Sequence, residues 1–180
     1  MSEELLVKKF GIYGWGSGEV DQLGLGDDIL EAKRPRKILP NEFFSSIKVV
    51  DVVCGAMHTL VLSNTGEVYS WGCNDDSALG RSGKDNEPGL TTLPIPINKV
   101  AAGDSHSIAY NTELNRVFIW GQYRNSDGKF GEPKRVPEEL KSKDWKGNVT
   151  KIVCGANHTM LLAGQKLYLW GNCEFGQIGR

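Results

Sequence analysis

The sequence has no long apolar run, no strong excess of one charge and no closely spaced pair of cysteines. None of its apolar runs approaches the ~20 residues that span a bilayer, so we expect no membrane contact. The net charge of -1 provides no bulk attraction to nucleic acid or anionic lipid. Residues 1–9 lack the basic start and apolar stretch of a signal peptide. We interpret them as a short N-terminal tail.

The cysteines do not form a recognisable redox or metal motif. They are Cys54, Cys73, Cys154 and Cys173, and no two are spaced as Cys-x-x-Cys. Each occupies a position in a repeat that is described below. Packing therefore explains them better than disulfides or zinc, and we expect a reducing compartment, the nucleus or the cytoplasm.

Motifs of bond-breaking catalysis are also lacking. The Gly-x-Gly pattern within residues 14–18 is not followed by a helical pattern, so it does not predict a phosphate-binding loop. The histidines His58, His106 and His158 lie far apart, with no recurrent carboxylate cluster beside them. We therefore favour buried structural histidines over metal ligands. The sequence predicts no enzyme chemistry, no cofactor and no metal.

Two motifs recur along the chain. Trp-Gly occurs four times and Gly-x-x-His three times, with about fifty residues between copies. A repeat of this length is typical of propeller blades. The 22 glycines also suit a chain of short strands and tight turns. The pairs are Trp15-Gly16, Trp71-Gly72, Trp120-Gly121 and Trp170-Gly171, and the Gly-x-x-His motifs occupy residues 55–58, 103–106 and 155–158.

The pattern inside the repeat is that of β-strands. In the second block, short β-branched or alternating runs at residues 48–54, 59–63 and 67–71 predict a three-stranded meander. Proline-containing segments predict a fourth, outer strand, because proline cannot donate to a sheet ladder. These segments lie near residues 36–39, 92–95 and 134–136. The expected fold is an all-β propeller over residues 10–180, with blocks at about 10–47, 48–98, 99–148 and 149–180.

The combined motif resembles a known family. Gly-x-x-His-Thr, a hairpin, Trp-Gly and then Gly-x-[Leu/Ile]-Gly-Arg are similar to the regulator of chromosome condensation repeat. That resemblance implies a seven-bladed propeller, of which this chain holds about three and a half four-stranded blades. Such a partial propeller leaves sheet edges open. We favour a piece of a longer protein over self-association of several copies into a closed ring.

Two irregularities in the repeat are candidate functional features. Asp104 is the only charged residue in the variable pairs of the Gly-x-x-His motifs. An acid at the central mouth would suit a basic partner surface, and a local capping role fits equally well. In the third block, residues 122–131 replace the usual ending and contain the hairpin signal Asp127-Gly128. This segment is either a probe into a partner or a tolerated surface insertion.

Both irregularities resemble the family's namesake, the exchange factor for the small GTPase Ran. The resemblance implies a Ran-facing ring and a wedge hairpin. Where the family has Asp, this chain has Glu19 and Asn157, and Asn157 removes a charge from the ring. The implied contacts are Glu19, His58, Asp104 and Asn157 in the ring, and Tyr123, Arg124, Asn125, Ser126, Asp127 and Gly128 in the wedge.

Other readings of the sequence stay open. The basic run Lys33, Arg34, Arg36 and Lys37 is either a nuclear localisation signal or a solvated loop. The family's chromatin-binding tail has no clear counterpart in residues 1–9, so contact with histones or DNA would use parts that are not present here. The alternative function is a binding propeller with another partner, as in related ubiquitin ligases, a plant ultraviolet photoreceptor and enzyme inhibitors. Exchange that requires the remaining blades is a further alternative.

Overall fold

The computed structural model describes residues 11–38, 47–124, 129–141, 143 and 145–179. Within these ranges the regular structure is β, with no α-helix and hence no helix that is suited to crossing a membrane. The predicted tail, residues 1–9, lies outside them. The strands are β1 Tyr13–Ser17, β2 Glu31–Lys37, β3 Val49–Cys54, β4 His58–Ser63, β5 Val68–Gly72, β6 Gly89–Thr91, β7 Lys99–Ala102, β8 His106–Asn111, β9 Arg116–Gly121, β10 Lys134–Leu140, β11 Val149–Cys154, β12 His158–Ala163 and β13 Lys166–Gly171.

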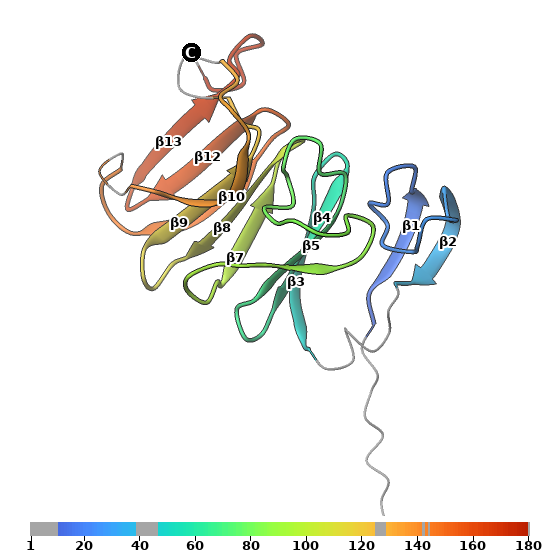
Figure 1. Ribbon diagram of the computed structural model, residues 1–180. Coiled ribbons are helices and arrows are strands. Elements are labelled where there is room, and N and C mark those ends of the chain that lie inside the picture. The colour runs from blue at the N-terminus through green and yellow to red at the C-terminus, as the bar shows by residue number, and fades with distance from the viewer. Residues whose placement is uncertain (1–10, 39–46, 125–128, 142, 144, 180) are drawn as a thin grey trace, which may run out of the picture.

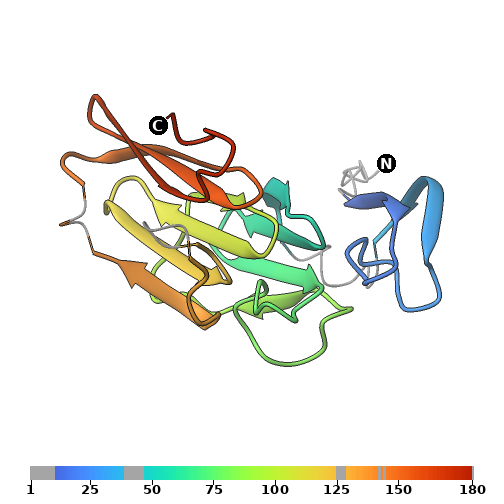
Figure 2. The same ribbon diagram turned by 90° about the horizontal axis from the view of Figure 1, so that it is seen from above.

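The strands form four antiparallel meanders. Two sheets have four strands, in the orders β3-β4-β5-β6 and β10-β9-β8-β7. The last sheet is β11-β12-β13, and β1 pairs with β2 alone. The sheets stand side by side in chain order, with β1 and β2 at one end of the row and β13 at the other (Figures 1 and 2).

The repeat motifs show which strands are equivalent. Trp-Gly lies in β1, β5, β9 and β13, which are therefore third strands of their blades. The strands that precede Gly-x-x-His are β3, β7 and β11, and β7 contacts both of the others. These first strands consequently face the propeller axis. The β1–β2 sheet thus holds the third and fourth strands of its blade. The β11-β12-β13 sheet holds the first, second and third strands of its blade.

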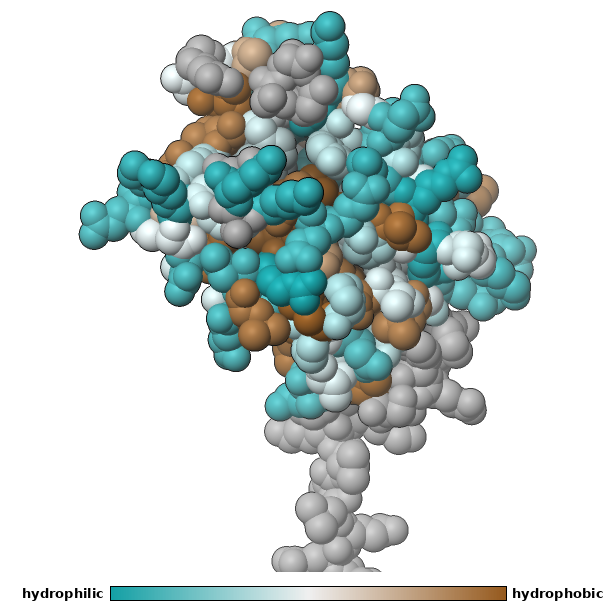
Figure 3. Space-filling view, turned by 60° about the vertical axis from the view of Figure 1, so that its left-hand side comes forward, coloured by the Kyte–Doolittle hydropathy of each residue, from teal (hydrophilic) through white to brown (hydrophobic). Residues whose placement is uncertain are grey.

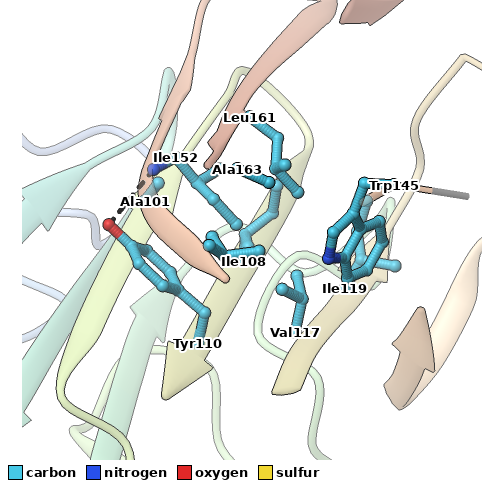
Figure 4. Packing of buried hydrophobic residues seen from close by; sticks show 10 residues of the cluster. Ala101, Ile108, Tyr110, Val117, Ile119, Trp145, Ile152, Leu161 and Ala163 are labelled. Atoms are coloured by element: carbon cyan, nitrogen blue, oxygen red, sulfur yellow. Dashed lines mark hydrogen bonds between the residues drawn. The ribbon is translucent and has the colours of Figure 1, made fainter. Parts of the chain in front are cut away.

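The core lies between the sheets rather than within any one of them. Because side chains alternate along a strand, Val61 of β4 packs toward the β1–β2 sheet while Leu60 and Leu62 pack toward the β7–β10 sheet. The next junction joins Ile108 and Ile119 to residues of β11 and β12 (Figure 4). Each inner sheet therefore buries both of its faces, and each sheet depends on its neighbours for stability.

The observed strands confirm the all-β prediction but correct the position of the outer strands. β6 ends at Thr91, whereas residues 92–95 were the expected strand. Pro94 within that segment and Pro96 directly after it cannot donate to a ladder, so pairing stops before them. β2 begins at Glu31, earlier than expected, and β10 includes the predicted residues 134–136. Both lie at the edge of their sheets, where their prolines are tolerated.

How deeply each tryptophan of a Trp-Gly pair is buried depends on the position of its sheet in the row. Trp71 and Trp120 are fully buried between blades, whereas Trp15 is 61% exposed on the first sheet. Leu167 on β13 is also exposed. Trp145, which lies outside the Trp-Gly register, is buried in the cluster between the last two sheets (Figure 4). On the face that Figure 3 shows, apolar residues are interspersed among hydrophilic ones.

Candidate partner-binding face

The Gly-x-x-His loops have one conformation with a steric cause. In each loop the glycine N–H donates to the carbonyl of the histidine three residues later, as from Gly103 to His106 at 2.8 Å. The imidazole folds back over the glycine. A Cβ added to Gly103 would lie 2.0 Å from Cε1 of His106, and the other two loops show the same conflict. Only glycine fits there, which explains the motif.

Two of the three histidines join neighbouring blades. His58 Nε2 lies 2.8 Å from Ser107 Oγ, and His106 Nε2 lies 3.1 Å from Thr159 Oγ1. Ser107 donates its own proton to the carbonyl of Ala78, so His58 Nε2 must be the donor to Ser107. Burial lowers the pKa of both His58 and His106 to about 4, which keeps the rings neutral at physiological pH.

This geometry changes the role of one predicted contact residue. The side chain of His58 is 1% exposed and already bonded, so we assign it to the blade junction rather than to a partner surface. In the part of the chain that the structure describes, no group of three or more potential metal ligands is gathered.

Two sets of loops share one end of the sheets. In each of the last three blocks, the residue after Trp-Gly donates its backbone N–H to the carbonyl of the residue before the histidine. These bonds are Cys73 to Met57 at 2.7 Å, Gln122 to Ser105 at 2.8 Å and Asn172 to Asn157 at 2.7 Å. The loop after β1 joins them, because Gln22 accepts a bond from Thr59 Oγ1. We call this end of the sheets the loop face.

Asp104 is central on the loop face. Its backbone N–H donates to the carbonyl of Ala156 in the next block at 2.9 Å, and its side chain is exposed. It borders a hollow of about 260 Å³ formed by three equivalent segments. Asp104 is the only charged residue among those that line it, and these are Cys54, Gly55, Ala56, Ala102, Gly103, Asp104, Cys154, Gly155 and Ala156.

Glu19, a predicted ring contact, belongs to a second series of carboxylates whose other members were missed in the sequence. Glu19 is exposed in the loop after β1, three residues beyond the glycine of Trp-Gly. The same position holds Asp75 and Glu174 in two other blocks, and both are exposed. Counting from each Trp-Gly pair would have found them. The third block has Arg124 at this position, and Asn157, the predicted uncharged ring member, is half-buried.

The predicted wedge begins at a defined base. Tyr123 is half-buried against the cluster between the last two sheets, and this burial raises its pKa. Arg124 forms an isolated bridge with Phe130, and Gly131 donates to the carbonyl of Tyr123. The four remaining wedge residues, Asn125, Ser126, Asp127 and Gly128, lie outside the described residues.

The basic run lies in a strand, which corrects the solvated-loop interpretation. β2 contains Lys33, Arg34, Arg36 and Lys37, and it pairs with β1 through Lys37 opposite Tyr13 and Arg36 opposite Gly14. Lys33 is 3.9 Å from Glu31. A localisation signal here would be presented on a strand that is already paired along one edge, and it stays a prediction.

The sheets and the loop face define part of a β-propeller built from repeats of about fifty residues. More particularly, residues 11–180 match the family model of the RCC1-like domain, and the chain belongs to that family. The predicted family and partial propeller are thereby confirmed.

Similar proteins have more than one function. The chain is 42% identical over 177 residues to the regulator of chromosome condensation of Drosophila melanogaster, covering 92% of this chain and 30% of that protein. It is 36% identical over 184 residues to the ultraviolet-B receptor UVR8 of Arabidopsis thaliana, covering 93% and 39%. The crystal structure of Prp20p of Saccharomyces cerevisiae, described with its binding to Gsp1p and histones, superposes with a TM-score of 0.83 at 29% identity, covering 97% and 44%. The chain thus spans less than half of each relative.

Proposed function

We propose that this chain is part of a guanine-nucleotide exchange factor for the small GTPase Ran. The observation that carries the proposal is the bond from Gln122 N–H to the Ser105 carbonyl. It places the start of the wedge segment beside Asp104, on the same face. The similarity to regulators of chromosome condensation, and to Prp20p with its binding to Gsp1p, the yeast Ran, supports this partner.

The charge of the loop face suits a basic partner. Glu19, Asp75, Asp104 and Glu174 are all exposed there, one from each block. Complementary charge accelerates encounter and fixes orientation, and its effect weakens with salt. Asn157 would contribute a hydrogen bond instead of a charge.

The proposed mechanism involves no bond chemistry. An exchange factor binds the nucleotide-free GTPase more tightly than the loaded one. Reciprocity then requires the factor to weaken nucleotide binding by the same ratio. In this proposal the carboxylates dock the GTPase and the wedge disturbs the loops that hold its phosphates.

The test is the release of labelled GDP from Ran. The full protein should accelerate release beyond the intrinsic rate, and Asp104→Asn should lower kcat/KM about fivefold, the effect of roughly 1 kcal/mol of lost charge pairing. Glu113→Gln is the matched control, because Glu113 is exposed in the hairpin between β8 and β9, at the opposite end of the sheets. Release at the intrinsic rate with the unmodified protein would contradict the proposal.

A binding propeller for another partner is the second candidate. The 36% identity to UVR8 favours it, because that relative is a receptor. Co-precipitation separates the two functions: an exchange factor retains nucleotide-free Ran and releases it when GDP is added. If Ran is not retained in either state, the exchange function is contradicted and the second candidate is favoured.

The proposed function suggests a nuclear location and contact with chromatin. Prp20p is described as binding histones, which supports histones as a second partner of the full protein. Fluorescence microscopy of the tagged protein, with and without substitution of Lys33 and Arg34 by alanine, tests whether the basic strand contributes to localisation.

A further inference from the structure

The base of the wedge segment is tied to the next block by one arginine. Nη1 of Arg124 lies 4.0 Å from Oε1 of Glu174, and its guanidinium carbon lies 4.3 Å from the centre of the Phe130 ring. The side chain of Arg124 is only 23% exposed, whereas that of Glu174 is 63% exposed. Arg124 is therefore largely enclosed by its own chain, and little of it is available for direct contact with a partner.

Glu174 is itself held in place. Asn172 Nδ2 donates to Glu174 Oε2 at 3.1 Å, and the backbone N–H of Glu174 donates to Asn172 Oδ1 at 2.9 Å. Asn172 is buried, and its own N–H donates to the carbonyl of Asn157 at 2.7 Å. The arginine is thus connected through two residues to the loop that carries Asn157.

The repeat shows that this arrangement is particular to the third block. Glu19, Asp75 and Glu174 occupy the position that Arg124 takes here. A fourth carboxylate would repel Glu174, whereas a guanidinium attracts it. The block that carries the cation is also the block whose loop departs from the repeat.

We propose that Arg124 is a positioning residue for the wedge. It joins the two ends of the segment through Phe130 and joins the segment to the Asn157 loop through Glu174. The base of the segment, where Arg124 meets Phe130, is thereby held to the loop face before the GTPase binds. This inference rests on the proposed function, since the segment is taken to act on the GTPase.

Positioning has a kinetic signature that differs from docking. Docking by the face carboxylates determines the concentration of GTPase needed, which is KM. If the base of the segment is already fixed, less conformational entropy is lost when the complex with the nucleotide-loaded GTPase rearranges to release nucleotide. This smaller loss raises kcat. Loss of the contacts that Arg124 makes with Phe130 and Glu174, which we call the clamp, should therefore lower kcat and leave KM nearly unchanged.

The experiment measures GDP release by the full protein over a range of GTPase concentrations. Arg124→Ala should lower kcat about three- to tenfold, given the typical strengths of a cation–π contact and a partly exposed ion pair. Arg124→Lys keeps the charge and loses the planar stacking, so it should recover part of the loss. Phe130→Leu should give a smaller decrease in kcat. Glu174→Gln should also lower kcat less than Arg124→Ala, and it should raise KM as well, because Glu174 is one of the face carboxylates.

Arg116→Ala is the matched control. Arg116 also lies over a phenylalanine, Phe118 at 5.1 Å, and also pairs with a carboxylate, Glu139 at 2.6 Å. It begins β9 at the end opposite the loop face. Its loss removes similar contacts and should leave kcat and KM unchanged.

A second measurement separates this inference from the proposed function. Hydrogen exchange of the Gly131 amide, which donates to Tyr123, is followed in the protein without GTPase. It should accelerate about tenfold in Arg124→Ala and not in Arg116→Ala, as expected for a lost local contact. If the unmodified protein does not accelerate GDP release from Ran, the proposed exchange function is contradicted. The hydrogen-exchange measurement still tests whether Arg124 holds the base of the segment. Unchanged Gly131 exchange, or a change in KM alone, would overturn the positioning role.

Discussion

His58 and Ser107 belong to different sheets, and a hydrogen bond of 2.8 Å joins His58 Nε2 to Ser107 Oγ. Ser107 Oγ in turn donates a hydrogen bond of 2.8 Å to the carbonyl of Ala78. Both side chains are at most 1% exposed. A continuous buried chain of hydrogen bonds thus crosses the junction between two blades, and its members have no access to water.

Removal of the Ser107 hydroxyl should show how much this chain of hydrogen bonds contributes to the free energy of unfolding. Ser107→Ala leaves the His58 N–H and the Ala78 carbonyl with one partner fewer, so we expect a loss of about 1–3 kcal/mol in the free energy of unfolding. Urea denaturation measures it. Ser82→Ala is the control, because Ser82 is exposed. Equal midpoints for the two variants would show that the bond contributes nothing.

Stability should fall below neutral pH. The pKa of His58 and His106 is about 4 in the fold, against an ordinary value of 6.5. Between these values the unfolded chain binds more protons than the folded one, so protonation favours unfolding as the pH falls. We expect a loss of about 1 kcal/mol per histidine at pH 5.5 relative to pH 7.5.

Two measurements check the pH dependence. Urea midpoints at several pH values give the slope, and NMR of the imidazole carbons reports protonation directly. Both rings should stay neutral at pH 5.5 in the folded protein. Ordinary titration of both rings near pH 6.5 in the native state would contradict the prediction.

The glycine of the histidine loop should not tolerate a methyl group. In Gly103→Ala the new Cβ would lie 2.0 Å from His106 Cε1 and 2.4 Å from Nδ1, so the imidazole would be forced out of its buried bond with Thr159. We expect a loss of about 1–3 kcal/mol, as for an overpacked core. Gly131→Ala is the matched control, since nothing lies within 4 Å of the position that its methyl group would take. Thermal denaturation of both variants should separate them by several degrees.

Two buried tryptophans should differ in their response to phenylalanine. Trp120 Nε1 donates to the Ala78 carbonyl at 2.8 Å, whereas Trp145 Nε1 has no hydrogen-bond partner among the described residues. Both substitutions remove similar volume, so the difference between them isolates the bond. Trp120→Phe should cost about 1–2 kcal/mol more than Trp145→Phe in the free energy of unfolding. The reverse order would show that the Trp120 bond does not offset the cost of burying its N–H.

The repeat made the fold predictable because its motif residues have local steric reasons. Gly103 accommodates the ring of His106, and Gly121 allows close approach to the Ser105 carbonyl, so sequence spacing records geometry directly. The outer strands were placed less well. β6 is only three residues long and β10 is mostly exposed, so neither carries the apolar alternation that identifies a strand.

The site was predictable only where it departs from the repeat. Asp104 and the third-block loop were found because they differ from the other copies. The ion pair between Arg124 and Glu174 was missed because it joins positions fifty residues apart in the sequence. Such a pair depends on how neighbouring sheets are oriented, which residue spacing within one block does not report.

At two blade junctions, one loop carbonyl accepts hydrogen bonds from two side chains of the next block. The Gln22 carbonyl accepts from Thr59 Oγ1 and Trp71 Nε1, and the Ala78 carbonyl accepts from Ser107 Oγ and Trp120 Nε1. The unit that unfolds cooperatively therefore does not coincide with the sequence repeat, because each of these junctions contains residues of two repeats. An engineered break in the chain is best placed at the β4–β5 or β8–β9 hairpin, which lies away from these junctions. Transplanting one block into another propeller would require the preceding loop to move with it.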